Sequence, residues 1–299
     1  MSKLSDVVDT ALEAPVVPSF TRVGSAVRSR LDDWTPVDDY DLTGRVVVLT
    51  GGTSGLGLAA ARTVAEADAT LVVIGRSPDK TKRVCAELAS SSGNERVHPV
   101  IADMGEPAQV RRAAEQILAE HPIVDTLVHN AGALTADRRT NADGLEATVA
   151  SQVVGPFLLT ALLLERLAEA PAARVLTMSS GGMYTAKLQI SGLVMSPETY
   201  NGSDQYARAK RAQVTLNELW PEHAPSTVHF HALHPGWADT PGVRDSLPTF
   251  RRVVGPLLRS PEDGADTLLW LIGDDEALAS TGGFWHDRRR RGIHKLGRT

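Results

Sequence analysis

The stretch Thr50-Gly51-Gly52-Thr53-Ser54-Gly55-Leu56-Gly57 decides the fold. It follows an apolar run at residues 46–49 that predicts a buried strand, and it leads into residues 56–67, whose pattern predicts a helix. Glycines let a backbone approach a pyrophosphate closely, and the following helix offers free N–H groups and the positive end of its dipole. We therefore interpret the stretch as a dinucleotide-binding turn. A tight strand–helix turn without a ligand is the competing interpretation, and a P-loop is disfavoured because no Gly-Lys-Ser/Thr follows.

The same alternation of strand and helix continues along the chain. Further strands are predicted at residues 71–74, 97–101, 127–129, 175–178 and 228–233, and helices at 80–89, 108–120, 145–168 and 207–222. Alternating elements of this length imply parallel pairing, and strands without polar alternation imply helices on both faces. We predict an α/β fold with one doubly wound (Rossmann) parallel sheet. Residues 1–40 form an N-terminal helical extension, and residues 41–299 form a dinucleotide-binding domain that includes the substrate site.

The extension carries an apolar stripe at helical spacing. Its members are Phe20, Val23, Val27, Leu31 and Trp34, with Arg22, Arg28 and Arg30 off the stripe. A helix packed on its own domain is the favoured interpretation, and a helix lying on a membrane surface is the alternative. The short basic run at residues 288–291 is expected to be a solvated tail.

Composition excludes several classes of function. The net charge is −5, which lacks the basic excess of a nucleic-acid-binding protein. Cys85 is the single cysteine, so no intrachain disulfide and no Cys-rich zinc site can form. Acidic residues stand where a signal peptide needs an apolar stretch, and the apolar run at 157–164 is too short for a bilayer, so we expect a cytoplasmic protein.

Three histidines near the sixth strand, His229, His231 and His234, suggest a metal site at first inspection. No acid or cysteine nearby completes a ligand set, and a strand that leads into a Pro-Gly loop explains the segment. We expect no metal site.

Six motifs appear in one order between residues 45 and 240. They are Gly51-x-x-x-Gly55-x-Gly57, Asp103-Met104, Asn130-Ala131-Gly132, Ser179-Ser180, Tyr206-x-x-x-Lys210, and Pro235-Gly236 with Thr240 beyond. Together they resemble the short-chain dehydrogenase/reductase superfamily. The strings around Ser180 and Pro235 resemble most the dehydrogenase/reductase member-12 subgroup, whose relatives include retinol-dehydrogenase-like enzymes.

The resemblance implies an oxidoreductase that moves a hydride between a nicotinamide cofactor and a small-molecule carbonyl or alcohol, which we expect to be hydrophobic. It also implies that Asp103 contacts adenine and that the Asn130 motif braces the sheet. The expected cofactor-binding residues are Thr50, Gly51, Thr53, Ser54, Gly55, Leu56, Gly57, Arg76, Ser77, Asp103, Met104, Asn130, Ala131, Gly132, Tyr206, Lys210, Pro235, Gly236 and Thr240. Helical dimer interfaces are common in the family, so a homo-oligomer is compatible with the resemblance.

The expected catalytic residues are Ser180, Tyr206 and Lys210. Tyr206 is the general acid/base, and Lys210 lies four residues on, on the same helix face, where its charge favours the phenolate. In the family this lysine also holds the nicotinamide ribose. In the family, the serine at the position of Ser180 donates a hydrogen bond to the substrate oxygen. Ser179 is the competing choice for this role.

The end of the second strand predicts NADP(H) as the cofactor. NAD sites place an acid there, whereas this chain has Arg76, whose guanidinium can bind a 2′-phosphate, and Ser77, which can assist.

Two departures from the family pattern bear on the chemistry. Gln152 replaces the family Asn, whose position holds a water of the proton relay, and its longer side chain could alter that relay. The interval from Ser180 to Tyr206 is about twice the usual family distance, and the extra segment is expected to form a flap beside the substrate. Because Gln152 departs from the pattern, a non-catalytic NADP(H)-binding regulatory protein is the alternative function.

Overall fold

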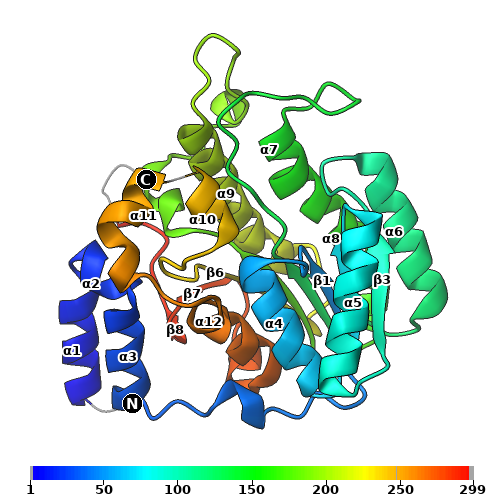
Figure 1. Ribbon diagram of the computed structural model, residues 1–299, viewed down its shortest axis with the longest axis horizontal. Coiled ribbons are helices and arrows are strands. Elements are labelled where there is room, and N and C mark those ends of the chain that lie inside the picture. Colours follow the sequence, from blue (N-terminus) through cyan, green and yellow to red (C-terminus); the bar gives the residue numbers. More distant parts are fainter. Residues whose placement is uncertain (1–2, 247, 296–299) are drawn as a thin grey trace.

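The computed structural model describes residues 3–246 and 248–295, and within them one mixed sheet organises the molecule (Figure 1). Its strand order is β3-β2-β1-β4-β5-β6-β7-β8. The strands are β1 (Val46–Thr50), β2 (Thr70–Gly75), β3 (Val97–Ile101), β4 (Thr126–His129), β5 (Ala173–Met178), β6 (Val228–Leu233), β7 (Gly283–His286) and β8 (Arg289–Arg290). All neighbouring strands from β3 to β7 in this order, β1 and β2 included, pair in parallel, and β8 pairs antiparallel with β7. The predicted doubly wound parallel sheet is confirmed, and the order reverses between β1 and β4, where such folds bind ligands.

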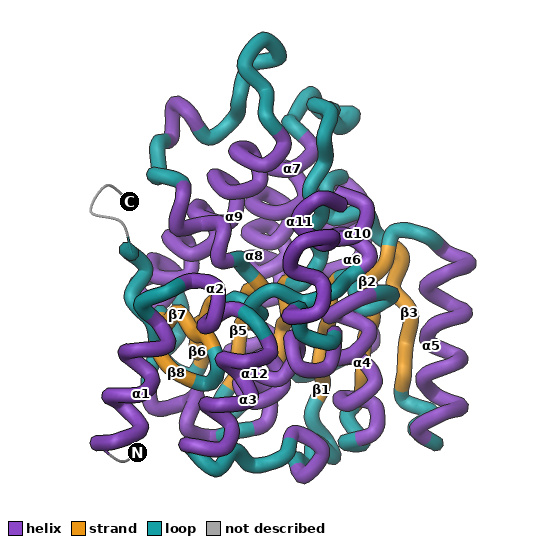
Figure 2. Tube along the Cα trace, turned by 60° about the vertical axis from the view of Figure 1, so that its left-hand side comes forward, coloured by secondary structure: helices purple, strands orange, loops and turns teal. Residues whose placement is uncertain are grey.

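Helices cover both faces of the sheet (Figure 2). One face packs against α4 (Gly55–Glu66), α5 (Pro78–Ser92) and α12 (Pro261–Gly273). The other packs against α6 (Pro107–Glu120), α8 (Gly155–Ala168) and α9 (Gly202–Leu219). In β1, Val47 and Leu49 point into the first core and Val48 into the second, because successive strand residues face opposite sides. The short helices α10 (Pro241–Ser246) and α11 (Pro248–Val254) follow β6.

The helix predicted at residues 145–168 is a composite. It runs through α7 (Ala147–Val149) and a π-helical segment (Ala150–Val154) into α8. Its length and apolar composition would suffice to cross a membrane, but core helices share these properties. Here Leu159, Leu163 and Leu167 are buried in the core beside the sheet. The continuous helix is longer than the apolar run at 157–164, and its apolar side is used in packing.

The N-terminal segment forms three helices, α1 (Lys3–Glu13), α2 (Val16–Phe20) and α3 (Arg22–Leu31). The prediction of one apolar stripe is wrong in detail. Thr21 is extended and separates α2 from α3, and Val23 is 44% exposed. Arg28, expected off the stripe, is fully buried. The buried side of α3 therefore contains the positive charge of Arg28, which needs hydrogen bonds and opposite charges inside the protein.

Those partners join the two ends of the chain. The Arg28 guanidinium donates to Asp9 at 2.7 Å and to Asp287 at 2.6 Å, and Asp287 also accepts from Arg259 at 2.9 Å. The guanidinium groups of Arg28 and Arg259 and the nearby His286 outweigh the effect of burial and hold the pKa of Asp287 well below its usual range. Each buried charge in this cluster thus has an opposite charge in contact, the condition under which burial is tolerated.

The basic run at 288–291 is not a solvated tail. Asp287 and Arg288 have φ values of 52° and 53°, which makes the tight turn of the β7–β8 hairpin. The Arg289 side chain is 8% exposed and binds Asp32 at 2.8 Å, and Arg291, also 8% exposed, binds Asp9 at 2.6 Å. The acids that bury these arginines lie in the N-terminal helices, so the sequence around residue 288 does not reveal them.

We expect Arg28→Met to lower the free energy of unfolding by about 3–5 kcal/mol, because it leaves buried carboxylates short of a positive charge. Urea denaturation followed by circular dichroism measures this loss. Arg30→Met on the same helix is the matched control, since Arg30 is exposed, and its effect should stay within about 0.5 kcal/mol. Equal losses in the two variants would contradict a stabilising role for the buried cluster.

Candidate active site

The glycine turn lies at the carboxyl end of β1 and leads into α4. Gly51 and Gly55 have φ values of +72° and +54°, in the left-handed region that favours glycine. A Cβ on Gly57 would lie 2.3 Å from the Gly51 carbonyl oxygen and 2.4 Å from Asn130 Nδ2, so only glycine fits there. The missing side chains allow the turn to press against the end of β4.

Asn130 and Thr50 join this turn to β4. Asn130 Nδ2 donates to the carbonyl oxygens of Thr50 at 3.1 Å and Gly51 at 3.2 Å. The Thr50 hydroxyl accepts from the backbone N–H groups of Asn130 and Ala131, both at 3.0 Å, and donates to Val128 O. These bonds hold the first residues after β4 against the glycine turn. The Asn130 motif therefore makes the brace that the resemblance implied.

The ends of β2, β3 and β6 bring the other expected cofactor residues to the same edge. Arg76 and Ser77 follow β2 and are exposed, and Arg76 forms no ion pair with a described residue. Asp103 follows β3, and its Oδ1 accepts from Gly105 N at 2.8 Å. Beyond β6, Thr240 lies beside Gly55, since a Cβ on that glycine would be 3.4 Å from it. Of the remaining members of this group, Thr53 and Ser54 lie in the glycine turn and Leu56 in the first turn of α4, while Met104 follows β3 and Pro235 and Gly236 follow β6.

The candidate catalytic residues meet where β5 ends beside α9. Ser179 Oγ donates to the Lys210 carbonyl oxygen at 3.1 Å, whereas Ser180 Oγ accepts from Gly182 N at 3.1 Å and lies close enough to Tyr206 to act on its pKa. Lys210 Nζ donates to Met178 O at 2.8 Å and lies 5.3 Å from the centre of the Tyr206 ring. The structure thus brings together the three residues that the sequence singled out, and it gives Ser179 a different partner from Ser180.

Burial shifts both titrating groups toward their neutral forms. It raises the pKa of Tyr206 to about 12, although the nearby Ser180 hydroxyl acts in the opposite direction. It lowers the pKa of Lys210 to about 7. The sequence led us to expect a lowered tyrosine pKa, whereas in this site burial has the larger effect.

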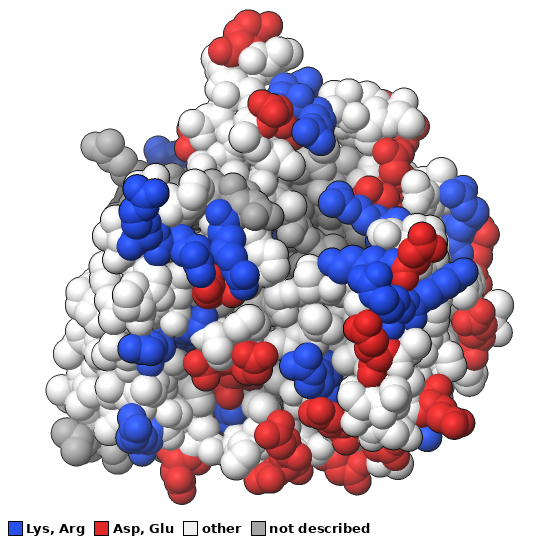
Figure 3. Space-filling view, viewed as in Figure 1, with Lys and Arg blue, Asp and Glu red and all other residues white. Residues whose placement is uncertain are grey.

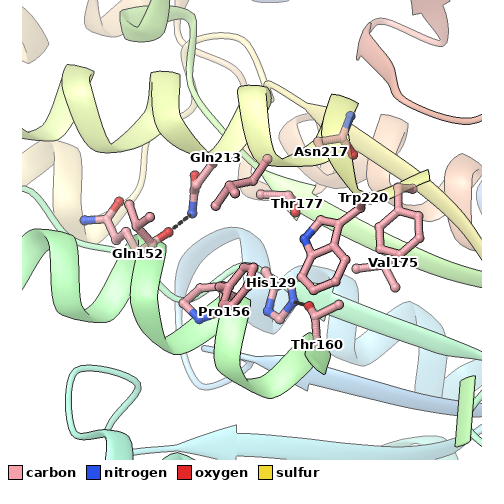
Figure 4. Close-up of a pocket in the computed structure, with 13 residues that line it drawn as sticks. His129, Gln152, Pro156, Thr160, Val175, Thr177, Gln213, Asn217 and Trp220 are labelled. Atoms are coloured by element: carbon pink, nitrogen blue, oxygen red, sulfur yellow. Dashed lines mark hydrogen bonds between the residues drawn. The ribbon is translucent and has the colours of Figure 1, made fainter. Parts of the chain in front are cut away.

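Gln152 lies in the π-helical segment and is fully buried. Its Nε2 donates to the carbonyl oxygen of Ala133 at 2.8 Å, and its own carbonyl oxygen accepts from Gln213 Nε2 at 2.6 Å. Figure 4 shows Gln152 and Gln213 at one end of a small cavity between α8, α9 and the sheet, with His129 and Trp220 further along. Sequence analysis missed Gln213, because its only signal is its position three residues after Lys210.

The segment between Ser180 and α9 packs against the loop at residues 133–146. Tyr200 Oη lies 3.1 Å from Thr135 Oγ1 and donates to the buried Glu146 at 3.4 Å. Arg138 Nε donates to Met195 O at 3.1 Å. Figure 1 shows the loops at 133–146 and 186–200 rising above the sheet edge. Glu146, which also caps α7, is a residue that sequence reasoning did not identify.

The N-terminal helices reach the substrate side through Phe20. A Cβ on Gly181, the residue after Ser180, would lie 2.4 Å from a carbon of the Phe20 ring. The Phe20 carbonyl oxygen accepts from Trp237 N at 2.7 Å, and the Trp237 ring packs against Phe250 of α11 at 5.0 Å. Phe20 therefore supports both sides of the wall that follows β5 and β6.

The histidines near β6 have separate structural partners. His231 Nε2 bonds to the carbonyl oxygen of Ala277, and its Nδ1 accepts from Trp285. His229 lies near Ser280 O, and His234 stacks on His286 with 3.9 Å between ring centres. These contacts account for the positions of the three rings.

The residues of this edge fit a dinucleotide. The glycine turn leaves room that a Cβ would fill, and the twelve-residue helix α4 begins directly behind it. Figure 3 shows a hollow in this face with Lys and Arg side chains on both sides. An anionic ligand would therefore meet a helix N-terminus and a positive surface together.

Fold and site together define the class of protein. Residues 45–249 match the model of the short chain dehydrogenase family, and the chain belongs to this family of oxidoreductases. It is 37% identical over 272 residues to human dehydrogenase/reductase SDR family member 12, covering 90% of this chain and 85% of that protein. It is 29% identical over 248 residues to human retinol dehydrogenase 11, covering 81% and 77% respectively. The predicted family and subgroup are confirmed.

Solved structures share the fold. A short chain dehydrogenase from Escherichia coli CFT073 complexed with NADPH superposes with a TM-score of 0.68 at 23% identity, covering 85% of this chain and 100% of that chain. A Shigella flexneri structure complexed with NADP gives 0.67 at 23% identity, covering 84% and 100%.

We expect Ser180→Ala to raise the pKa of Tyr206 further, because it removes the nearby hydroxyl that can donate to the phenolate. Bonds to charged groups are worth about 1.5–3 kcal/mol, which corresponds to about one pKa unit or more. Ultraviolet absorbance after a pH jump reports tyrosine ionisation, and Tyr206→Phe identifies the signal among four tyrosines. Ser179→Ala is the control, since its hydroxyl bonds to the Lys210 carbonyl, and a shift there equal to that of Ser180→Ala would contradict the assignment.

Proposed function

We propose that this chain is an NADP(H)-dependent oxidoreductase that interconverts a carbonyl and an alcohol on a hydrophobic small molecule. The observation that carries the proposal is the meeting of Ser180, Tyr206 and Lys210 at the sheet edge that also carries the glycine turn. A nicotinamide cofactor supplies hydride transfer when it is bound. The residues of this chain bind it, orient the substrate and move the proton.

Tyr206 supplies the proton in the reductive direction. Its pKa of about 12 keeps the phenol protonated at neutral pH, so that Oη can donate to the nascent alkoxide oxygen. Ser180 donates a hydrogen bond to the same oxygen and stabilises its negative charge. Lys210, once protonated, stabilises the phenolate that remains, and it would hold the nicotinamide ribose. Ser179 keeps this arrangement in place by joining the end of β5 to the backbone of α9.

NADP(H) is the cofactor that the end of β2 favours. Arg76 is exposed at the position where NAD sites carry an acid, and no described acid pairs with it. Its guanidinium is therefore available to a 2′-phosphate. The solved relatives complexed with NADPH and NADP support this choice.

A hydrophobic substrate fits the residues around the site. Trp237 and Phe250 face one another beyond β6, and Leu188, Ile190 and Val194 are exposed on the loop at 186–200. The match to a retinol dehydrogenase, whose name states an apolar alcohol, supports the same substrate class. A panel of retinoids, steroids and medium-chain aldehydes would identify the substrate by the absorbance of NADPH.

We expect Arg76→Leu to remove a preference for NADPH over NADH. A charge-assisted hydrogen bond contributes about 1.5–3 kcal/mol, or roughly tenfold to over a hundredfold in affinity. Fluorescence titration with both reduced cofactors measures the ratio. Arg83→Leu is the control, because Arg83 is exposed on α5 and pairs with Glu87. NADH binding as tight as NADPH in the parent protein would refute the assignment.

We expect Tyr206→Phe to lower kcat by about 10²–10⁴ while cofactor affinity is retained, because only the proton donor is removed. Tyr40→Phe is the control, since Tyr40 bonds to Asp274, away from the three candidate catalytic residues. Full turnover in Tyr206→Phe would show that the acid is misassigned. A parent protein that binds NADPH but turns over no substrate of the panel would favour the regulatory alternative.

A further inference from the structure

A main-chain oxygen of the π-helical segment accepts a hydrogen bond from a side chain of α9. The Gln152 carbonyl oxygen accepts from Gln213 Nε2 of α9 at 2.6 Å (Figure 4). Gln213 is itself 4% exposed, so this bond is shielded from water. The main-chain oxygen at this position is thus already engaged with the protein.

The side-chain oxygen of Gln152 is in the opposite situation. Nε2 donates to the Ala133 carbonyl oxygen at 2.8 Å, and because that oxygen can only accept, the orientation of the amide is determined. Oε1 then faces away, is buried, and has no hydrogen-bond partner among residues 3–246 and 248–295. An acceptor left unpaired in the interior costs about 1–3 kcal/mol, so such a group calls for an explanation.

Lys210 brings a donor to the same space as that oxygen. The point where a Cβ on Gly132 would stand is 3.1 Å from Gln152 Oε1 and 3.4 Å from Lys210 Nζ. Gly132 therefore leaves open a space that both groups border. The ammonium group has three N–H donors, and its hydrogen bond within the described chain goes to Met178 O.

We propose that Gln152 Oε1 is a hydrogen-bond acceptor for the Lys210 ammonium, directly or through one bridging water. Because the main-chain oxygen of Gln152 already accepts from Gln213, the side-chain Oε1 is the oxygen of this residue that is left to accept from Lys210. Gln152 is a positioning residue: it acts on Tyr206 through the charge of Lys210. The effect on Tyr206 rests on the proposed function, whereas the hydrogen bond between Gln152 and Lys210 does not.

The physical consequence concerns the charge of Lys210 at neutral pH. Burial brings its pKa down to about 7, close to neutral pH, so the neutral form competes with the charged one. An acceptor that bonds to the ammonium favours the charged form and opposes this effect. A charged Lys210 stabilises the Tyr206 phenolate, so Gln152 would extend the pH range in which the tyrosine can lose its proton.

The test is a titration of the Lys210 side chain in the full-length protein without cofactor or substrate. The chain has six lysines, so ¹³C labelling at the ε-carbon gives a readable NMR spectrum, and Lys210→Arg identifies the resonance. Gln152→Met keeps the length of the side chain but removes the acceptor. We expect it to lower the Lys210 midpoint by about one unit, the effect of losing one bond to a charged group.

Gln213→Met is the matched control. It removes one buried hydrogen bond from the same residue by the same replacement, but it leaves Oε1 in place and frees the main-chain oxygen, so the Lys210 midpoint should not fall. An unchanged midpoint in Gln152→Met, or a fall in Gln213→Met as large as in Gln152→Met, would overturn the proposal.

Gln152→Glu keeps the test decisive if the methionine variant does not fold. It retains an oxygen of the same reach and adds a negative charge, so the Lys210 midpoint should rise. A midpoint that stays or falls would overturn the proposal. Because the measurement needs no turnover, it is independent of whether the chain proves to be an active enzyme.

Discussion

The hydrogen bonds from Asn130 to the glycine turn are the constraint on which the site depends. They hold Gly51 against the end of β4 and so place the glycine turn beside Ala131, which Gly132 follows. Gly132 in turn borders both Gln152 and Lys210. One three-residue segment after β4 thus connects the edge that would hold a dinucleotide with the residues that would move the proton. A shift of this segment would disturb both parts together.

A second constraint acts from the ends of the chain. Asp287 lies between Arg28 and Arg259, and this contact attaches the N-terminal helices to the last hairpin of the sheet. Phe20, at the end of α2, then packs on Gly181 and bonds to the backbone of Trp237. Residues distant in the sequence therefore support the wall next to Ser180, the candidate catalytic serine. The ionic cluster is buried, so its strength does not depend on solvent screening as a surface pair would.

Much of the domain was predictable because its signals are local. The alternation of apolar strands and amphipathic helices predicted β1 to β6 and the helices between them, since the period of each element is written in consecutive residues. The strands β7 and β8 and the helix α12 were not predicted. Gly283–His286 is too short to show a period, and its place in the sheet depends on pairing with β6. The solvated tail at 288–291 was a wrong prediction, because the acids that bury it lie near residues 9 and 32.

The sequence by itself determined the class of fold, the glycine turn, and the candidate residues Ser180, Tyr206 and Lys210, because spacing along one strand or helix specifies which face a side chain occupies. The tertiary structure alone decided what surrounds them. The partner of Ser179, the bond from Gln213 to Gln152, and the support of Trp237 by Phe20 each join segments from different elements. It also decided the direction of the pKa shifts, since burial, which the sequence does not show, acts on Tyr206 and Lys210 more strongly than their neighbours. Local patterns record the period of a chain, whereas contacts and desolvation arise only when distant segments exclude water together.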